Sequence, residues 1–276
     1  MTHYYRLSGG GNDFLALTGD ASKPGTNGIR SLCRRGLSAG ADGLFILRRL
    51  PQGAELQYFN ADGRPAELCL NATRCAVRLA DHLGWSSGPT RIETGAGTIT
   101  GRLTGPGTVA LELPPPAAPV VHTLSLANSS WNGWQVDVGV PHFVMVWRKS
   151  LAGAPVAELG PQLRHHPDWG ERGSNVDFVR FIASHALEIR TFERGVEGET
   201  LACGTGVMAS VAAGLTAGAL ELPVRALTLG GFELEVSADE SGPQARWSLA
   251  GDARLIAEGD LCPEALAVPP PPEWTS

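Results

Sequence analysis

The chain has 276 residues, of which 43% are hydrophobic and 18% are charged, a balance that is typical of a folded globular protein and excludes a disordered one. Its formal net charge of −6 excludes a general affinity for nucleic acid or for an anionic membrane surface. The five cysteines occur without a signal peptide or a CxxC pair, so we expect a cytoplasmic protein with no disulfide framework, no metal site and no membrane segment.

Short strands separated by Gly, Asn, Asp and Pro turns dominate the chain. We predict strands at residues 14–18, 43–47, 56–59, 91–94, 108–112, 143–147, 177–181, 186–191 and 232–236. Helical periodicity is confined to residues 27–35, 70–83, 154–164 and 204–219. The pattern predicts an α+β protein with a high strand content.

The proline run at residues 114–116 forms the clearest joint, because it fits neither a helix nor a central strand. It divides the chain into an N-terminal half, residues 1–116, and a C-terminal half, residues 117–276, with the last strand free to return to the first half. Each half has a Gly-rich turn, an apolar strand, a polar loop, a cysteine and then a helix. This repeated order predicts a duplicated domain with a cleft between the halves.

Cys69 and Cys203 each stand where a polar loop turns into a helical pattern rich in alanine. A thiol at a helix start faces unpaired backbone N–H groups and the positive end of the helix dipole, which favours the thiolate. The N–H groups that follow the cysteine can also bind a carboxylate without a cationic side chain. One thiolate and one thiol on opposite faces of a carbon atom would remove one proton and return another. The cysteine pair therefore predicts inversion of a stereocentre in a small anion.

Six motifs resemble those of the diaminopimelate epimerases, pyridoxal-independent amino-acid racemases with two catalytic cysteines. They are GGGNDF, GADGL, NADGR, IETGAG, SNVDFV and ERGVEGETLACGTG, and they span nearly the whole chain in the family's order. The resemblance implies two pseudo-symmetric, barrel-like halves, each an antiparallel-rich sheet wrapped around a central helix, with the active site in the cleft between them. It implies no cofactor and no metal.

Carried over residue by residue, the resemblance makes Cys69 and Cys203 the acid/base pair. The N–H groups that would hold the reacting carboxylate belong to Leu70, Asn71, Gly204 and Thr205. The residues that would line the substrate pocket are Asn12, Asn60, Asn175, Glu193 and Arg194. The Arg194 guanidinium suits the distal carboxylate of a diacid. His142 and Glu193 match residues that tune the pKa values of the thiols.

Several of these positions also have a plainer structural interpretation. Asn12 and Asn60 are equally typical of turns. Glu193 and Arg194 could form a surface ion pair, and His142 could be a buried histidine whose nitrogens are satisfied.

Three features depart from the family's pattern. Leu70 and Ala72 replace the glycines on either side of the asparagine that follows the first cysteine. Val140 replaces an asparagine in a Gly-Asn-Pro-His turn, where a polar contact to a distal group can dominate the choice of substrate. Ala257 falls where the family often has a tyrosine at a dimer contact, which weakens the expectation of a homodimer.

We therefore predict interconversion of LL- and meso-2,6-diaminopimelate, a step of lysine and peptidoglycan synthesis. The expected partners are a small amino-acid substrate and a second copy of the chain, but neither nucleic acid nor membrane. The first alternative is a two-cysteine racemase of another amino acid, such as histidine. The second is a ligand-binding or thiol-sensing module without turnover.

Overall fold

The computed structural model describes residues 2–19, 24–126, 129–239 and 246–267. These residues form two compact units. The first comprises the described residues up to Val109 together with those from Ala253 onward, and the second comprises Ala110–Asp252. The division falls within β8 (Thr108–Leu113), a few residues before the prolines at which the sequence places the joint. The strand that follows Ala253 belongs to the first unit.

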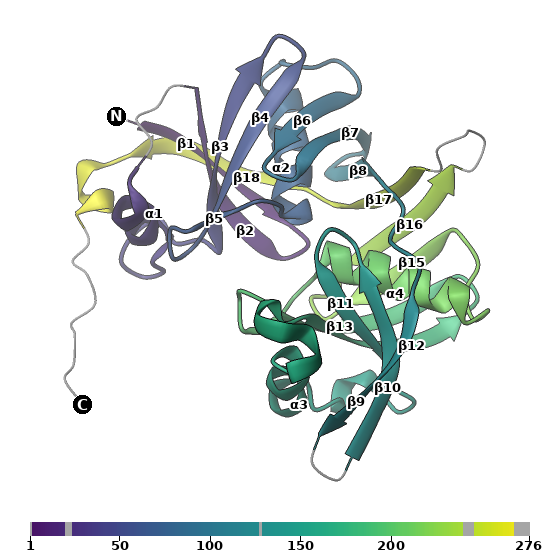
Figure 1. The fold of residues 1–276 in the computed structure, drawn as a ribbon. Helices are drawn as coiled ribbons and strands as arrows, with labels where there is room; N and C mark the ends of the chain where they lie inside the picture. The colour runs from purple at the N-terminus through teal and green to yellow at the C-terminus, as the bar shows by residue number, and fades with distance from the viewer. Residues whose placement is uncertain (1, 20–23, 127–128, 240–245, 268–276) are drawn as a thin grey trace, which may run out of the picture. The chain divides into compact units, whose positions relative to one another are not determined.

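The first unit contains two α-helices and a mainly antiparallel set of strands (Figure 1). Its strands are β1 (Thr2–Gly9), β2 (Asn12–Thr18), β3 (Gly43–Leu50), β4 (Gly53–Asn60), β5 (Pro65–Ala66), β6 (Thr90–Thr94), β7 (Gly97–Gly105) and β18 (Arg254–Leu261). Its helices are α1 (Thr26–Cys33), α2 (Leu70–His82) and the 3-10 helix η3 (Pro263–Leu266).

The second unit has the same kind of composition. Its strands are β9 (Val120–Leu126), β10 (Ser129–Asp137), β11 (Pro141–Val146), β12 (Asn175–Ala183), β13 (Ala186–Glu193), β14 (Gly198–Thr200), β15 (Val224–Thr228), β16 (Glu233–Asp239) and β17 (Arg246–Asp252). Its helices are α3 (Val156–Arg164), α4 (Gly204–Thr216) and the 3-10 helices η1 (Leu151–Gly153) and η2 (Pro167–Arg172).

The two units repeat one order of strand pairings. In the first unit β1–β2 and β3–β4 are antiparallel, β2–β3 is parallel across α1, and β4 pairs with β5 and, across α2, in parallel with β6. In the second unit β10–β11 and β12–β13 are antiparallel, β11–β12 is parallel across α3, and β13 pairs with β14 and, across α4, in parallel with β15. The predicted pair of pseudo-symmetric α+β halves is thereby confirmed.

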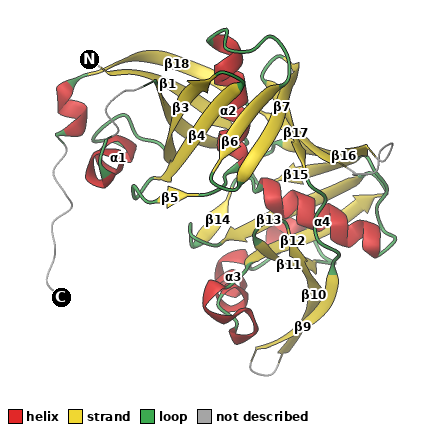
Figure 2. Cartoon of the chain, turned by 45° about the horizontal axis from the view of Figure 1, so that its top comes forward, coloured by secondary structure: helices red, strands yellow, loops and turns green. Residues whose placement is uncertain are grey.

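Helices α2 and α4 are the central helices of their units. Helix α2 packs against β1, β4, β6, β7 and β18, and α4 packs against β10, β11, β12 and β16 (Figure 2). The predicted apolar stripe of α2 lies inside, since Cys75, Ala76 and Leu79 are fully buried. Helix α4 is buried on every side over most of its length, which explains why its sequence contains so many Ala and Gly residues.

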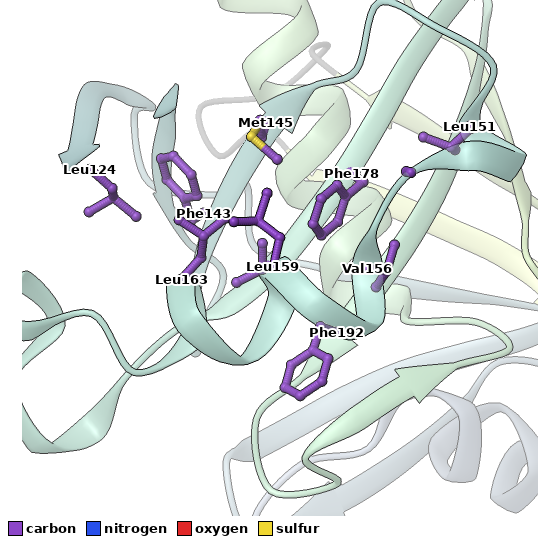
Figure 3. Packing of buried hydrophobic residues seen from close by; sticks show 11 residues of the cluster. Leu124, Phe143, Met145, Leu151, Val156, Leu159, Leu163, Phe178 and Phe192 are labelled. Atoms are coloured by element: carbon purple, nitrogen blue, oxygen red, sulfur yellow. The ribbon is translucent and has the colours of Figure 1, made fainter. Parts of the chain in front are cut away.

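A cluster of aromatic and aliphatic side chains holds α3 against one face of the strands of the second unit (Figure 3). Phe143, Phe178 and Phe192 come from β11, β12 and β13 and pack with Leu159 and Leu163 of α3. Because side chains alternate along a strand, the neighbours of these three phenylalanines point to the opposite face. That opposite face is the one on which α4 lies.

No α-helix in the described part of the chain is long and apolar enough to cross a membrane.

Candidate functional site

Cys69 is the N-cap residue of α2. Its Sγ accepts a hydrogen bond from the Ala72 N–H at 3.5 Å, and the Thr73 N–H and Oγ1 donate to its carbonyl oxygen at 2.8 and 2.9 Å. The thiol therefore occupies the capping position that a Ser or Asp side chain usually takes. Leu70 and Asn71 are the first two residues of α2, at the end of a helix where backbone N–H groups can bind an anion.

A chain of side-chain amides leads from this helix start to the β1–β2 turn. The Asn71 Nδ2 donates to the Asn12 Oδ1 at 2.7 Å, and the Asn12 Nδ2 donates to the Asp42 Oδ2 at 3.2 Å. The buried Arg74 donates from Nη2 to the Asn71 Oδ1 at 2.6 Å, which fixes the orientation of that amide. Asn12 is therefore more than a turn residue, because its side chain is held against α2.

Two other predicted residues of the first unit lie in different settings. Asn60 ends β4 and closes a turn, since its N–H donates to the Arg64 carbonyl at 2.9 Å and its carbonyl accepts from the Gly63 N–H at 2.8 Å. No hydrogen bond between described residues links the Asn60 side chain to Cys69 or Asn12. The Leu70 side chain is buried, with 4% of its surface exposed.

Cys203 caps α4 in the same manner as Cys69 caps α2. Its Sγ accepts from the Gly206 N–H at 3.4 Å and lies 3.4 Å from the Thr205 Oγ1. Burial raises the pKa of the Cys203 thiol well above its ordinary value, and the charges of Glu193 and Asp177 raise it further. The contacts with Thr205 and Gly206 lower the pKa but do not offset these effects. At Cys203 the N–H groups of the helix start thus favour the thiolate, as expected, but burial and the two carboxylates oppose them.

His142 lies on the α4 face of the strands, fully buried. Its Nδ1 is 2.7 Å from the Asp177 Oδ2, and its Nε2 is 3.0 Å from the Thr205 Oγ1. Asn175 follows the same face, with its Nδ2 3.0 Å from the Pro141 carbonyl and 3.4 Å from the His142 Nε2. The register explains this proximity, because His142 and Asn175 are direct partners in the parallel β11–β12 pair.

Glu193 and Arg194 end β13 and begin its turn, and they do not form an ion pair with each other. The Glu193 Oε1 accepts from the Thr200 Oγ1 at 2.6 Å, and the interaction of its carboxyl with Cys203 lowers its pKa. Burial raises the pKa of the Glu193 carboxyl in spite of these hydrogen bonds. The Arg194 N–H donates to the Asn175 Oδ1 at 2.9 Å.

The Arg194 guanidinium is a cation without an ion-pair partner among the residues that the structure describes. Burial lowers its pKa, and the neighbouring charges of Arg172 and Arg164 lower it further. A partly desolvated cation beside two others favours the binding of an anion.

The structure thus connects the predicted residues of the second unit into one hydrogen-bonded group. The members are His142, Asn175, Glu193, Arg194, Cys203 and Thr205, with Gly204 opening the helix among them. In the first unit it connects Asn12 with Asn71 beside Cys69, but not Asn60. The sequence reasoning missed Arg74, Asp42 and Asp177. Asp177 alone carried a signal, as a charged residue inside the apolar run of NVDFV.

Comparison with known proteins agrees with this geometry. The family model described as Diaminopimelate epimerase matches residues 134–255. The diaminopimelate epimerase of Aquifex aeolicus is 34% identical over 279 residues, which cover 95% of this chain and 99% of the relative. That of Chlorobaculum tepidum is 35% identical over 266 residues, which cover 92% and 99%.

A solved structure extends the likeness of fold beyond these relatives. A hydroxyproline epimerase from Agrobacterium vitis, with bound trans-4-hydroxy-L-proline, superposes with a TM-score of 0.70 at 14% identity, covering 95% of this chain and 93% of that one. At that identity the likeness concerns the fold alone. The two relatives above one third identity over nearly the full length decide the classification, and the chain belongs to the diaminopimelate epimerase family.

Proposed function

We propose that the chain is a cofactor-independent epimerase that interconverts LL- and meso-2,6-diaminopimelate, as its relatives' name indicates. The observation that carries the proposal is the matched pair of cysteine caps. Each sulfur accepts the third N–H of a central helix, at 3.5 Å for Cys69 and 3.4 Å for Cys203. Two thiols in equivalent positions of a duplicated fold suit the removal of a proton by one and its return by the other.

In this proposal the α-carboxylate of the substrate binds to the first N–H groups of the two helices. They belong to Leu70 and Asn71 in α2 and to Gly204 and Thr205 in α4. These donors stabilise the negative charge that develops when Cα loses its proton. One cysteine acts as the base on one face of Cα while the other, as a thiol, is the acid on the opposite face.

We assign the binding of the distal end of the substrate to residues of the second unit and to the side-chain amides of Asn12 and Asn60 in the first. Arg194 offers a guanidinium without an ion-pair partner among the described residues to the distal carboxylate, and this arrangement would favour a diacid. Asn175 fixes the main chain of Arg194, and Asn12 and Asn60 complete the pocket. Glu193 and His142 adjust the protonation of the thiols.

One observation favours the second candidate, a racemase of another amino acid such as histidine. Val140 is half-buried and apolar at the turn that leads into β11, beside Pro141 and His142. An apolar side chain there offers no hydrogen bond to a polar distal group of the substrate.

The test is the exchange of the Cα proton of LL-diaminopimelate in deuterated water, followed by NMR with reductant present. We expect deuterium at Cα together with formation of the meso isomer. Cys69→Ala and Cys203→Ala should each reduce inversion by about 10²- to 10⁴-fold, the usual contribution of one acid/base group. Cys262→Ala, at an exposed cysteine outside the group, is the matched control and should leave the rate unchanged.

Each other outcome points to a different function. Inactivity on diaminopimelate with racemisation of another amino acid would select the second candidate. Ligand binding without exchange, unaffected by either cysteine variant, would indicate a binding or thiol-sensing module. A cytoplasmic location and a homodimer stay predictions, which fractionation and light scattering would check.

A further inference from the structure

A hydrogen-bonded chain under α4 leads from a buried carboxylate to Cys203. The His142 Nδ1 lies 2.7 Å from the Asp177 Oδ2, the His142 Nε2 lies 3.0 Å from the Thr205 Oγ1, and that oxygen lies 3.4 Å from the Cys203 Sγ. Asp177 and His142 have no exposed side-chain surface. All four residues belong to the second unit, so the chain is complete within one compact body.

The neighbouring amide determines which nitrogen of His142 carries the proton. The Asn175 Oδ1 accepts from the Arg194 N–H at 2.9 Å, and its Nδ2 donates to the Pro141 carbonyl at 3.0 Å, so the orientation of the amide is fixed. That same Nδ2 faces the His142 Nε2 at 3.4 Å. Because an N–H group faces it, Nε2 presents its lone pair in the neutral imidazole, and Nδ1–H donates to Asp177.

Asp177 has further polar neighbours besides His142. The Thr191 Oγ1 donates a hydrogen bond to the Asp177 Oδ1 at 2.8 Å. The first turn of α4 lies directly above, since a Cβ on Gly206 would come within 2.4 Å of that oxygen. The positive end of the helix dipole therefore faces the carboxylate. Buried carboxylates require this kind of compensation.

We propose that Asp177, His142 and the hydroxyl of Thr205 form a proton relay that loads and unloads Cys203. His142 and Thr205 carry the proton, and Asp177 is a positioning residue that holds the imidazole in the required tautomer. The inference rests on the proposed role of Cys203 as an acid/base group. It assigns His142 to this cysteine through the side-chain hydroxyl of Thr205, whereas the backbone N–H of Thr205 is the group proposed to bind the substrate.

The proton transfers balance without any co-reactant. The Cys203 thiol gives its proton to the Thr205 Oγ1 while the Thr205 hydroxyl gives its own proton to the His142 Nε2. The result is a thiolate and an imidazolium, and the imidazolium is paired with the Asp177 carboxylate. The reverse transfers restore the thiol, so that Cys203 can act as a base in one direction of the reaction and as an acid in the other.

Glu193 is the competing group on Cys203, because its carboxyl and the thiol influence each other's pKa. The charged and titratable groups that face Cys203 within the second unit are thus Glu193 from β13, Asp177 from β12 and His142 from β11. Glu193→Gln keeps the shape of the side chain and removes the competing base. Any effect of Asp177 that passes through His142 must persist in that background.

The direction in which Asp177→Asn changes the alkylation rate of Cys203 distinguishes a relay from simple charge repulsion. If Asp177 only repels the thiolate, Asp177→Asn lowers the pKa of Cys203 and speeds its alkylation by iodoacetamide at neutral pH. If Asp177 supports the imidazolium, the same change weakens the base and slows alkylation. We expect slower alkylation by about tenfold, which corresponds to an upward shift of one pKa unit. The rate is measured against pH by mass spectrometry of the Cys203 peptide, with Cys69 as internal reference.

The hydroxyl of Thr205 supplies the second arm of the test. Thr205→Val keeps the shape and the backbone N–H but breaks the chain, and it should slow alkylation of Cys203, whereas Thr205→Ser should rescue it. In the Thr205→Val background only repulsion remains, so Asp177→Asn should then speed the reaction. Ser210→Ala is the matched control, since it removes another buried hydroxyl from α4 that has no partner among the described residues.

Alkylation needs no turnover, so its outcome is independent of the proposed epimerase activity. Slower reaction in Asp177→Asn, alone and with Glu193→Gln, and its reversal in Thr205→Val would support the relay even if diaminopimelate proved not to be the substrate. Faster reaction in Asp177→Asn, or equal rates in Thr205→Val and Thr205→Ser, would overturn it. Thermal melting checks each variant, and if Asp177→Asn does not fold, the Thr205 pair decides.

Discussion

Gly206 lets the first turn of α4 lie against the carboxylate of Asp177. A Cβ at this position would meet the Asp177 Oδ1 at 2.4 Å and the Thr191 Oγ1 at 3.1 Å. Neither oxygen can move far, because the two are hydrogen-bonded to each other and Asp177 is also bonded to His142. This glycine is required by its neighbours and not by its own backbone conformation.

Gly206→Ala should therefore destabilise the second unit by about 2 kcal/mol, a typical cost of overpacking. It should also slow alkylation of Cys203 by displacing Asp177 from His142. Urea unfolding and the alkylation assay would measure the two effects. Gly153→Ala is the control, because a Cβ there meets open space and should change stability little. An unchanged unfolding midpoint in Gly206→Ala would contradict the proposed tight contact.

At single residues the sequence was informative where the chemistry is local. The cap positions of Cys69 and Cys203 follow from a polar loop before a helical pattern, and both were predicted correctly. The carboxylates that raise the pKa of Cys203 beyond the effect of its burial belong to other strands, Glu193 to β13 and Asp177 to β12. The partner of a buried charge cannot be predicted from the residues beside it in the sequence.

Among the elements, the four α-helices and half of the strands in the described residues were predicted from the sequence. All nine predicted strands and four predicted helices are present, with ends that differ by a few residues. No predicted range covers the other nine strands of the described residues: β1, β5, β7, β9, β10, β14, β15, β17 and β18. Of these, β5 and β14 have only two and three residues, and β18 is mostly exposed and does not alternate. Such strands exist because a partner strand lies beside them, as β1 does for β18.

The side chain of Glu197 holds the turn between β13 and β14. The backbone of Glu197 has a left-handed φ of 55°. Its Oε1 accepts from the Gly195 N–H at 2.9 Å and from the Arg164 Nη2 at 2.9 Å, and its Oε2 lies 3.0 Å from the His165 Nε2. The turn carries Arg194. The buried guanidinium of Arg164 thus fixes the element that presents the proposed anion site.

Glu197→Gln should cost about 1 kcal/mol at neutral pH, a small value because the carboxylate is partly exposed and screened. Burial alone raises the pKa of Glu197, but the Gly195 N–H and the Arg164 charge hold it below its ordinary value. A carboxylate with a lowered folded pKa stabilises the protein above its unfolded pKa, about 4.3, and loses this contribution as the pH falls through the folded value.

The difference in free energy of unfolding between Glu197→Gln and the unsubstituted chain should accordingly disappear in acid. Urea unfolding at pH 7 and pH 3 would show it, and KM for the diacid should rise more than kcat falls. Glu188→Gln, which breaks the more exposed 3.5 Å pair with Arg180, is the control. A cost in Glu197→Gln that is equal at both pH values would indicate a loss of packing instead of charge.

At the scale of the whole molecule, the duplication was visible in the sequence as a faint but ordered similarity, and the pairings of the strands confirm it. The sequence left the last strand free to return to the first half, and β18 does so by pairing with β1. Each unit has its own central helix surrounded by its own strands. A cavity introduced into one core should therefore destabilise mainly the unit that contains it.

Leu79→Ala in α2 and Met208→Ala in α4 test this expectation, since both side chains are fully buried. Each should cost about 2–5 kcal/mol through lost burial and an unfilled cavity. We expect Leu79→Ala to accelerate hydrogen–deuterium exchange of α2 and of β1, β4 and β6, and Met208→Ala to accelerate exchange of α4, β11 and β12, measured peptide by peptide. Local opening of this kind reports the cooperative unit to which a residue belongs. Equal acceleration throughout the chain in either variant would mean that the two cores unfold as one, although each has its own central helix.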